Sequence, residues 1–245
     1  MSTLIFSEKA KFYHDSRPRY PKKVFEYILK ITPSNSEVVE FGCGTGIFTQ
    51  NLIELNYNVT AIEPCEEMLS FCKKVNCLSK TTRLIHSKAE DIVLEPDAID
   101  AFFFPQSLHW IDIPKIKKVI SAAGRNDFHI YTIWNSRARD YCKKHIELSK
   151  IINKFKDKFT NKIQINSDPT KLLKSLKDDK ICKIYKTSHK HYLDFNGVIN
   201  LFLSTSDVDL SLQHDESISD LNSWFEKYKS GNKVEIIYDC YLAII

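Results

Sequence analysis

The sequence lacks long apolar runs, a paired set of cysteines and an amino-terminal signal. None of its 245 residues belongs to an apolar stretch near the roughly 20 residues needed to cross a bilayer. Residues 1–10 have neither an apolar core nor a small-residue cleavage site, so we expect no secretion signal. The seven cysteines are odd in number and show no CxxC spacing, which argues against a disulfide framework. These absences predict a cytoplasmic protein that spans no membrane.

The composition excludes a disordered or fibrous chain, because 43% hydrophobic and 27% charged residues are ordinary globular values. Cys65, Cys72 and Cys77 lie close in sequence, but their spacing matches no common zinc pattern, and we expect no metal. The net charge of +4 hides an asymmetry, since residues 143–190 hold 14 Lys and 5 acids, or +9. This basic segment predicts an anionic partner, although a solvated lysine-rich helix face explains the charge equally well.

Strand-like and helix-like stretches alternate over the first 135 residues in the rhythm of βαβ units, which predicts a parallel sheet. The predicted strands in this part are 37–41, 59–62, 83–86, 98–104 and 128–134. The predicted helices are 22–31, 48–55 and 68–75. Later stretches predict a long lysine-rich helix, a strand, two helices and a final strand, over 137–159, 181–195, 196–203, 217–229 and 234–245.

This order predicts an α/β fold with a doubly wound, Rossmann-like sheet of seven strands. The sheet is expected to be mostly parallel, with an antiparallel pair at one edge and a helical insertion. We expect one domain over residues 1–245. Its parts would be a cofactor-binding core (1–135), a Lys-rich helical insertion (136–180) and carboxy-terminal strands and helices that complete the sheet (181–245).

Glycine is scarce, and three of the six glycines, Gly42, Gly44 and Gly46, fall between the first predicted strand and its helix. Glycines there permit a tight turn and let a ligand approach the backbone. In an open α/β sheet this turn lies at the carboxyl ends of the strands, where ligands bind. The spacing is G-x-G-x-G, whereas a dinucleotide site has G-x-G-x-x-G. Glu40 would also repel a pyrophosphate and attract an ammonium group, so the loop disfavours NAD.

Glu63 follows the second predicted strand, 17 residues after Gly46. A carboxylate in this position accepts hydrogen bonds from the two hydroxyls of a nucleoside ribose. Methyl-donor and dinucleotide sites both use such an acid. Glu63 therefore predicts adenosine binding without choosing between them.

Residues 40–46 resemble the first motif of the class I S-adenosylmethionine-dependent methyltransferases, acid-x-G-x-G-T-G. The resemblance extends along nearly the whole chain, and it includes the small-molecule subgroup that contains trans-aconitate methyltransferases. It implies S-adenosyl-L-methionine as cofactor and methyl transfer to a small molecule. The implied cofactor-binding residues are Tyr13, Arg17, Glu40, Gly42, Cys43, Gly44, Thr45, Gly46, Glu63, Pro64, Met68, Ala89, Glu90, Asp91, Pro105, Gln106 and Ser107.

The loop after the fourth predicted strand carries His109 and Trp110, which the resemblance places in the substrate pocket. His109 is the candidate catalytic base, since an ordinary histidine pKa suits proton removal near neutrality. The alternative is that both residues only shape the pocket. A carboxylate acceptor would need no base, whereas a phenol, alcohol or carbon acid would.

Three other functions stay open. An RNA or protein methyltransferase could dock through the Lys-rich insertion, with strongly salt-dependent binding, although no RNA-binding module is visible. A binder of adenosine ligands could keep the pocket without turnover, and an NAD-dependent oxidoreductase is disfavoured by Glu40. We expect a small acceptor with a carboxylate, because of the local +9 charge. The sequence leaves the oligomeric state open.

Overall fold

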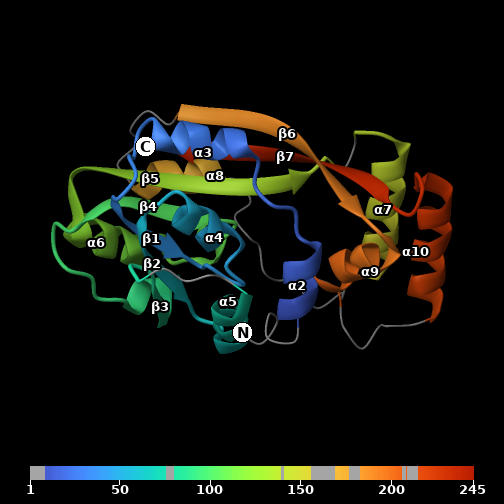
Figure 1. The fold of residues 1–245 in the computed structure, drawn as a ribbon, viewed down its shortest axis with the longest axis horizontal. Coiled ribbons are helices and arrows are strands. Elements are labelled where there is room, and N and C mark those ends of the chain that lie inside the picture. The colour runs from blue at the N-terminus through green and yellow to red at the C-terminus, as the bar shows by residue number, and fades with distance from the viewer. Residues whose placement is uncertain are drawn as a thin grey trace. The chain divides into compact units, whose positions relative to one another are not determined.

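The computed structural model describes residues 9–75, 80–138, 141–155, 169–176, 183–205, 208 and 215–245 (Figure 1). Cys77 and residues 139–140, 156–168 and 177–180 of the predicted insertion lie outside the described part. The α-helices are α2 (Ala10–Ser16), α3 (Lys22–Leu29), α4 (Ile47–Glu54), α5 (Glu66–Val75), α6 (Ile113–Ala123), α7 (Lys143–Lys154), α8 (Pro169–Leu176), α9 (Phe195–Leu203) and α10 (Asp215–Tyr228). Two 3₁₀ helices are η1 (Ala89–Asp91) and η2 (Leu108–Trp110). The strands are β1 (Glu37–Phe41), β2 (Asn58–Glu63), β3 (Arg83–His86), β4 (Ile99–Pro105), β5 (Gly124–Arg137), β6 (Lys183–Leu193) and β7 (Val234–Ile244).

The strands form one sheet in the order β3-β2-β1-β4-β5-β7-β6. The neighbours from β3 to β5 pair in parallel. The order reverses between β1 and β4, so the carboxyl ends of these two strands border the switch point where α/β sheets bind ligands. The predicted seven-stranded, doubly wound sheet is confirmed.

Strand β7 runs antiparallel to β5. The N–H of Ile130 donates to the carbonyl of Ile245 (2.9 Å), and the N–H of Ile245 donates back to Ile130 (3.1 Å). This reciprocal exchange is typical of antiparallel pairs. The same register continues to the other end of the pair, where the N–H of Ala138 donates to the carbonyl of Ile237 (3.1 Å).

Side-chain contacts place β6 antiparallel to β7. The hydroxyl of Ser188 donates to Oδ1 of Asp239 (2.6 Å), and the hydroxyl of Tyr192 donates to Oε2 of Glu235 (3.1 Å). Residue numbers rise along one strand as they fall along the other, with one constant register. The predicted antiparallel edge is therefore present.

The chain divides into two compact units. The sheet unit comprises residues 19–135, 165–187 and 240–245, and the helical unit comprises 1–18, 136–164 and 188–239. The two helices of the predicted insertion belong to different units: α7 packs on α10 in the helical unit, and α8 packs on α6 and η2 in the sheet unit. That the whole chain acts as one domain stays a prediction.

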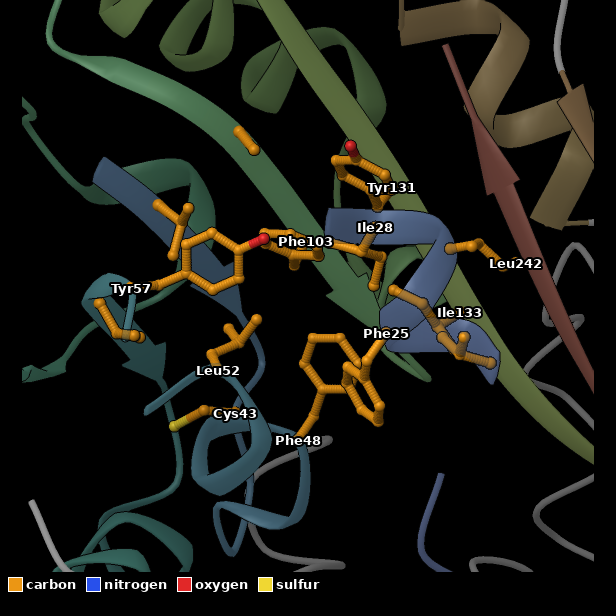
Figure 2. Close-up of a cluster of buried hydrophobic side chains, with 14 of the residues drawn as sticks. Phe25, Ile28, Cys43, Phe48, Leu52, Tyr57, Phe103, Tyr131, Ile133 and Leu242 are labelled. Atoms are coloured by element: carbon orange, nitrogen blue, oxygen red, sulfur yellow. The ribbon is translucent and has the colours of Figure 1, made fainter. Parts of the chain in front are cut away.

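The sheet unit buries an apolar cluster on each face of its strands. One cluster joins α3 and α4 to the sheet, with Phe103 stacked on Tyr131 at a centroid distance of 4.7 Å (Figure 2). The other cluster joins α6 and α8 to the opposite face. Helices on both faces explain why β1 and β4 read as nearly continuous apolar runs.

The helical unit has its own core, formed by α7, α9, α10 and the first half of β7. Trp224 of α10 is buried, and its indole N–H donates to the carbonyl of Lys144 (2.9 Å). Helix α2 packs on α9 in the same unit. In the described part of the chain, no helix is both long and apolar enough to cross a membrane.

Helices α7 and α6 differ from the sequence predictions. The helix expected over 137–159 begins at Lys143, because Arg137 completes β5 and Cys142 is still extended (φ −159°, ψ 169°). Helix α6 was not predicted, although Asp112 caps it by accepting a hydrogen bond from the N–H of Lys115 (3.1 Å). The adjacent Pro114 suits a first helical turn.

Candidate functional site

The loop after β1 turns on three glycines in the left-handed region. Gly42, Gly44 and Gly46 have φ values of +73°, +57° and +81°. The N–H groups of Gly42 and Cys43 both donate to the carbonyl of Ile62 in β2 (2.8 and 3.1 Å). A side chain is disfavoured in this conformation, which explains why glycine occupies these positions.

The surroundings of Gly42 and Gly44 differ. A β-carbon at Gly42 would lie 2.6 Å from Cβ of Ser107, whose hydroxyl donates to the carbonyl of Phe41. A β-carbon at Gly44 would meet no atom of the described residues within 4 Å. Gly42 therefore lets the loop pack closely against the segment after β4, whereas Gly44 leaves open space that a ligand could fill.

Glu63 connects the glycine loop to the start of α5. Its Oε2 accepts from the N–H of Gly44 (2.8 Å), and its Oε1 accepts from the N–H of Cys65 (3.0 Å). Burial raises the pKa of Glu63, while the two N–H donors lower it. An ionised carboxylate accepts about four hydrogen bonds, so capacity remains for two ribose hydroxyls.

Glu40 lies at the carboxyl end of β1 and is fully buried. Its Oε2 accepts from the hydroxyl of Thr49 in α4 (2.7 Å), and its Oε1 has no partner among the described residues. Burial, as the largest effect, raises its pKa to about 8, and the Thr49 hydrogen bond opposes this rise. A buried acceptor without a donor is costly. A cationic group reaching Glu40 would satisfy it and favour its ionised form.

The other predicted residues of the loop and of α5 are mostly buried. Thr45 is 1% exposed, and Met68 is 3% exposed. The buried Cys43 thiol forms a hydrogen bond with the thiol of Cys72, which with burial raises the pKa of Cys43. The carbonyl of Pro64 accepts from Nε2 of His86 (3.1 Å).

The segment after β3 forms η1. Ala89 is buried, and Oε1 of Glu90 accepts from the N–H of Asp112 (2.7 Å). Asp91 is exposed. Glu90 thus ties the segment after β3 to the start of α6, a connection that the sequence did not predict.

The segment after β4 carries a second strained turn. Gln106 follows Pro105 and has a positive φ of 58°. Its backbone N–H donates a hydrogen bond to the carbonyl of Ile133 (2.8 Å), and its side-chain amide donates one to the carbonyl of Asn135 (3.0 Å). His109 and Trp110 follow in η2, with ring centroids 5.1 Å apart. Burial lowers the pKa of His109 to about 4. This imidazole is neutral at pH 7 but a weak base.

Tyr13 and Arg17 belong to the helical unit. The Arg17 guanidinium lies over the Tyr13 ring, 4.8 Å from its centroid, and Nη2 donates to the carbonyl of Ser204 (2.9 Å). Nε of Arg17 is buried without a hydrogen-bond partner in the described part of the chain. That these two residues contact a cofactor stays a prediction from the sequence.

Within the sheet unit, hydrogen bonds join two of the predicted residues to the loop and to the strand end before it. Glu63 accepts from the N–H of Gly44, and Ser107 donates to the carbonyl of Phe41. Thr49 was missed by the sequence reasoning. The signal was available, because a buried acid at a strand end needs a donor, and Thr49 is the third residue of the helix that follows. Cys72 had no comparable signal.

Comparison with known proteins agrees with this geometry. Residues 39–125 match the methyltransferase domain family. This stretch runs from the middle of β1 to the start of β5 and therefore contains the glycine loop, Glu63 and η2. For these residues the match confirms the resemblance to methyltransferases, whereas it does not test the trans-aconitate subgroup.

One similar protein is an uncharacterised methyltransferase of Mycobacterium bovis, 31% identical over 139 residues, or 55% of this chain. The chain spans about half of that relative, 54% of its length. Among solved structures, an Anaeromyxobacter dehalogenans protein assigned to the type II methyltransferases has a TM-score of 0.65 at 13% identity, covering 93% of this chain and 96% of its own. Phosphoethanolamine N-methyltransferase 2 of Haemonchus contortus, solved with S-adenosyl-L-methionine, has a TM-score of 0.53 at 13% identity, covering 99% of this chain and 57% of its own. These two structures share the fold.

Proposed function

We propose that the chain is an S-adenosyl-L-methionine-dependent methyltransferase that acts on a small, carboxylate-bearing molecule. The observation that carries the proposal is the pair of buried carboxylates beside the glycine loop. Among the described residues, Glu40 presents an oxygen without a donor, Gly44 leaves open space, and Glu63 keeps acceptor capacity. A cationic amino-acid tail suits Glu40, and a ribose suits Glu63.

The residues present fit this cofactor. Glu40 would hold the ammonium group, Glu63 the ribose hydroxyls, and the segments around Met68 and η1 the adenine, in line with the resemblance. When bound, the cofactor supplies a methyl group activated by a sulfonium. The protein's own part is to align the acceptor with that methyl group, since proximity provides much of the acceleration in such a transfer.

The state of His109 favours an acceptor that needs no strong base. Its pKa of about 4 leaves it unprotonated at pH 7, but so weak a base removes a proton poorly from an alcohol or phenol. A carboxylate acceptor is already ionised at pH 7. We therefore assign His109 and Trp110 to the shape of the acceptor pocket, with His109 as the candidate base only for a more acidic acceptor.

Calorimetry tests the proposal. The protein should bind S-adenosylmethionine and S-adenosylhomocysteine and fail to bind NAD. Glu40→Gln should weaken the binding of both nucleosides. Glu54→Gln on α4 should not, because Glu54 is exposed and accepts a hydrogen bond from Gln50. Transfer of a labelled methyl group to a carboxylate in a metabolite extract would then identify the acceptor class. Binding of NAD without binding of S-adenosylhomocysteine would refute the proposal.

The structure weakens the alternative of docking RNA or an acidic protein through the lysine-rich helix. Lys154 of α7 pairs with Glu216 and Asp220 of α10 (both 2.8 Å). Lys227 of α10 pairs in turn with Glu147 of α7 (2.9 Å). Because α10 supplies two acids to Lys154, part of the basic charge of α7 is neutralised within the helical unit, whereas the Lys227 pair engages an acid of α7.

A further inference from the structure

A row of polar side chains crosses the antiparallel edge of the sheet within the helical unit. The hydrogen bond from Ala138 N–H to the Ile237 carbonyl fixes the register of β5 on β7, and this register sets Arg137 directly opposite Tyr238. Residues opposite each other on antiparallel strands have β-carbons about 5 Å apart on one face. Arg137 and Tyr238 are therefore side-by-side neighbours.

The register of β6 on β7 extends this row. With Ser188 beside Asp239, the next residue, His189, lies opposite Tyr238, and the two rings are 5.9 Å apart. His191, two residues further, lies on the same face, with its ring 6.1 Å from Tyr238. The row thus contains a guanidinium, a phenol and two imidazoles.

Helix α2 brings a second guanidinium to this row. Nε2 of His191 donates to the carbonyl of Ser16 (2.8 Å), which fastens the end of α2 to this face of β6. Arg17 comes next, and its charge, with that of Arg137, acts on Tyr238. The Ser204 carbonyl and the Tyr13 ring orient Arg17, and its buried Nε has no partner among the described residues.

Tyr238 is suited to donate a hydrogen bond. Its side chain is 4% exposed, and burial raises its pKa, so the hydroxyl keeps its proton at neutral pH. Arg17 and Arg137 are half-buried. A guanidinium partly shielded from water is stabilised by an oxyanion, with which its planar fork forms two parallel hydrogen bonds. Two guanidiniums and a phenol on one face match the acceptors of a carboxylate or phosphate group.

We propose that Arg17, Arg137 and Tyr238 form an anion-binding site that takes a carboxylate or phosphate group of a small molecule. The inference concerns binding and stands independently of methyl transfer. Because Arg17 is also one of the cofactor-binding residues that the resemblance implies, Arg137 and Tyr238 are the residues to test.

The test is calorimetric titration with citrate and, separately, with inorganic phosphate at low salt. The wild-type protein should bind at least one probe, and the stronger one identifies the anion class. Arg137→Gln should weaken binding of that probe by about 30-fold or more, because the half-buried guanidinium would lose two charge-assisted hydrogen bonds to the anion. Tyr238→Phe, which keeps the ring, should weaken it by about 10-fold. The affinity of Arg137→Lys for the probe should lie between those of wild type and Arg137→Gln, because the charge remains while the planar guanidinium fork is lost.

Arg125→Gln is the matched control. Arg125 lies on the same strand, β5, but in the sheet unit, where it pairs with Asp100. Its loss should leave binding of the probes unchanged. Titration of each protein with S-adenosylhomocysteine reports folding and tests the proposed function separately. Wild-type protein that binds neither probe, or Arg137→Gln and Tyr238→Phe variants that bind as wild type does, would overturn the inference.

Discussion

Substitutions at the glycines with positive φ should distinguish a glycine that is required for packing from one that is required for ligand binding. Gly42, Gly44 and Gly231 all have left-handed φ values, +73°, +57° and +63°. A β-carbon would overlap Ser107 at Gly42, but it would meet nothing within 4 Å at Gly44 or Gly231. Gly231 lies in the turn before β7 in the helical unit and serves as the matched control.

The structure gives an expected order of stability for the alanine variants. A left-handed conformation costs a non-glycine residue about 1–2 kcal/mol, which applies at all three positions. At Gly42 the 2.6 Å approach to Cβ of Ser107 adds overpacking of about 1–3 kcal/mol, because that atom cannot rotate away. Urea unfolding should therefore show a loss of about 2–5 kcal/mol for Gly42→Ala and about 1–2 kcal/mol for Gly44→Ala and Gly231→Ala.

Binding of S-adenosylhomocysteine should follow a different order. Gly44→Val fills the open space and should lower affinity by at least about 100-fold, or about 2.8 kcal/mol. Gly231→Val introduces the same strain and should leave affinity unchanged. Wild-type affinity in Gly44→Val would show that the ligand lies elsewhere. Equal stability of Gly42→Ala and Gly44→Ala would refute the packing argument.

Three further predictions concern titration and capping. The pKa of Glu40 is raised to about 8, so its contribution to the stability of the unliganded protein should be lost as the pH rises from about 4.5 through 8. Over this range the free energy of unfolding should fall by up to about 1.4 kcal/mol per pH unit. Glu40→Gln should remove this pH dependence in thermal or urea unfolding. His145 donates from Nδ1 to Ala138 and accepts at Nε2 from Ile237, which requires the neutral ring, and burial lowers its pKa. The stabilisation by the neutral His145 should therefore be present above pH 6.5 and lost as the pH falls. His145→Ala should lower the free energy of unfolding by about 2–4 kcal/mol in urea at pH 8. A urea midpoint equal to that of the wild-type protein would contradict this prediction. Asp112→Ala should cost about 1 kcal/mol, and Asp112→Asn, which keeps the cap, much less.

The sheet was predictable because its signals are local. Strands β1 and β3 begin and end where the apolar runs predicted, and the other strands are displaced by a few residues. Each parallel strand is an apolar run bounded by turn residues, and the glycine loop marks the first crossover. The fold class followed from this rhythm alone.

The failures share a physical cause, since they depend on partners distant in sequence. Residues 137–138 have a helical pattern, but the Ala138 N–H is taken by Ile237, about 100 residues later. Similarly, the sequence around Gly42 does not predict that Ser107 packs against this glycine. Cross-strand register decides such contacts, and local propensity gives way to it.

The role of Glu40 could be predicted from the sequence only in part. An acid at this strand end was recognisable from the sequence, but its energetic cost was not. That cost comes from full burial with one oxygen that has no partner among the described residues, which appears only once α4 and the loop enclose Glu40. A core optimised for stability alone would place an apolar residue there, since an unpaired buried carboxylate opposes folding. A ligand that brings positive charge to Glu40 would relieve that cost only when bound. The destabilising carboxylate is thus the strongest physical reason to expect a cationic ligand beside the glycine loop.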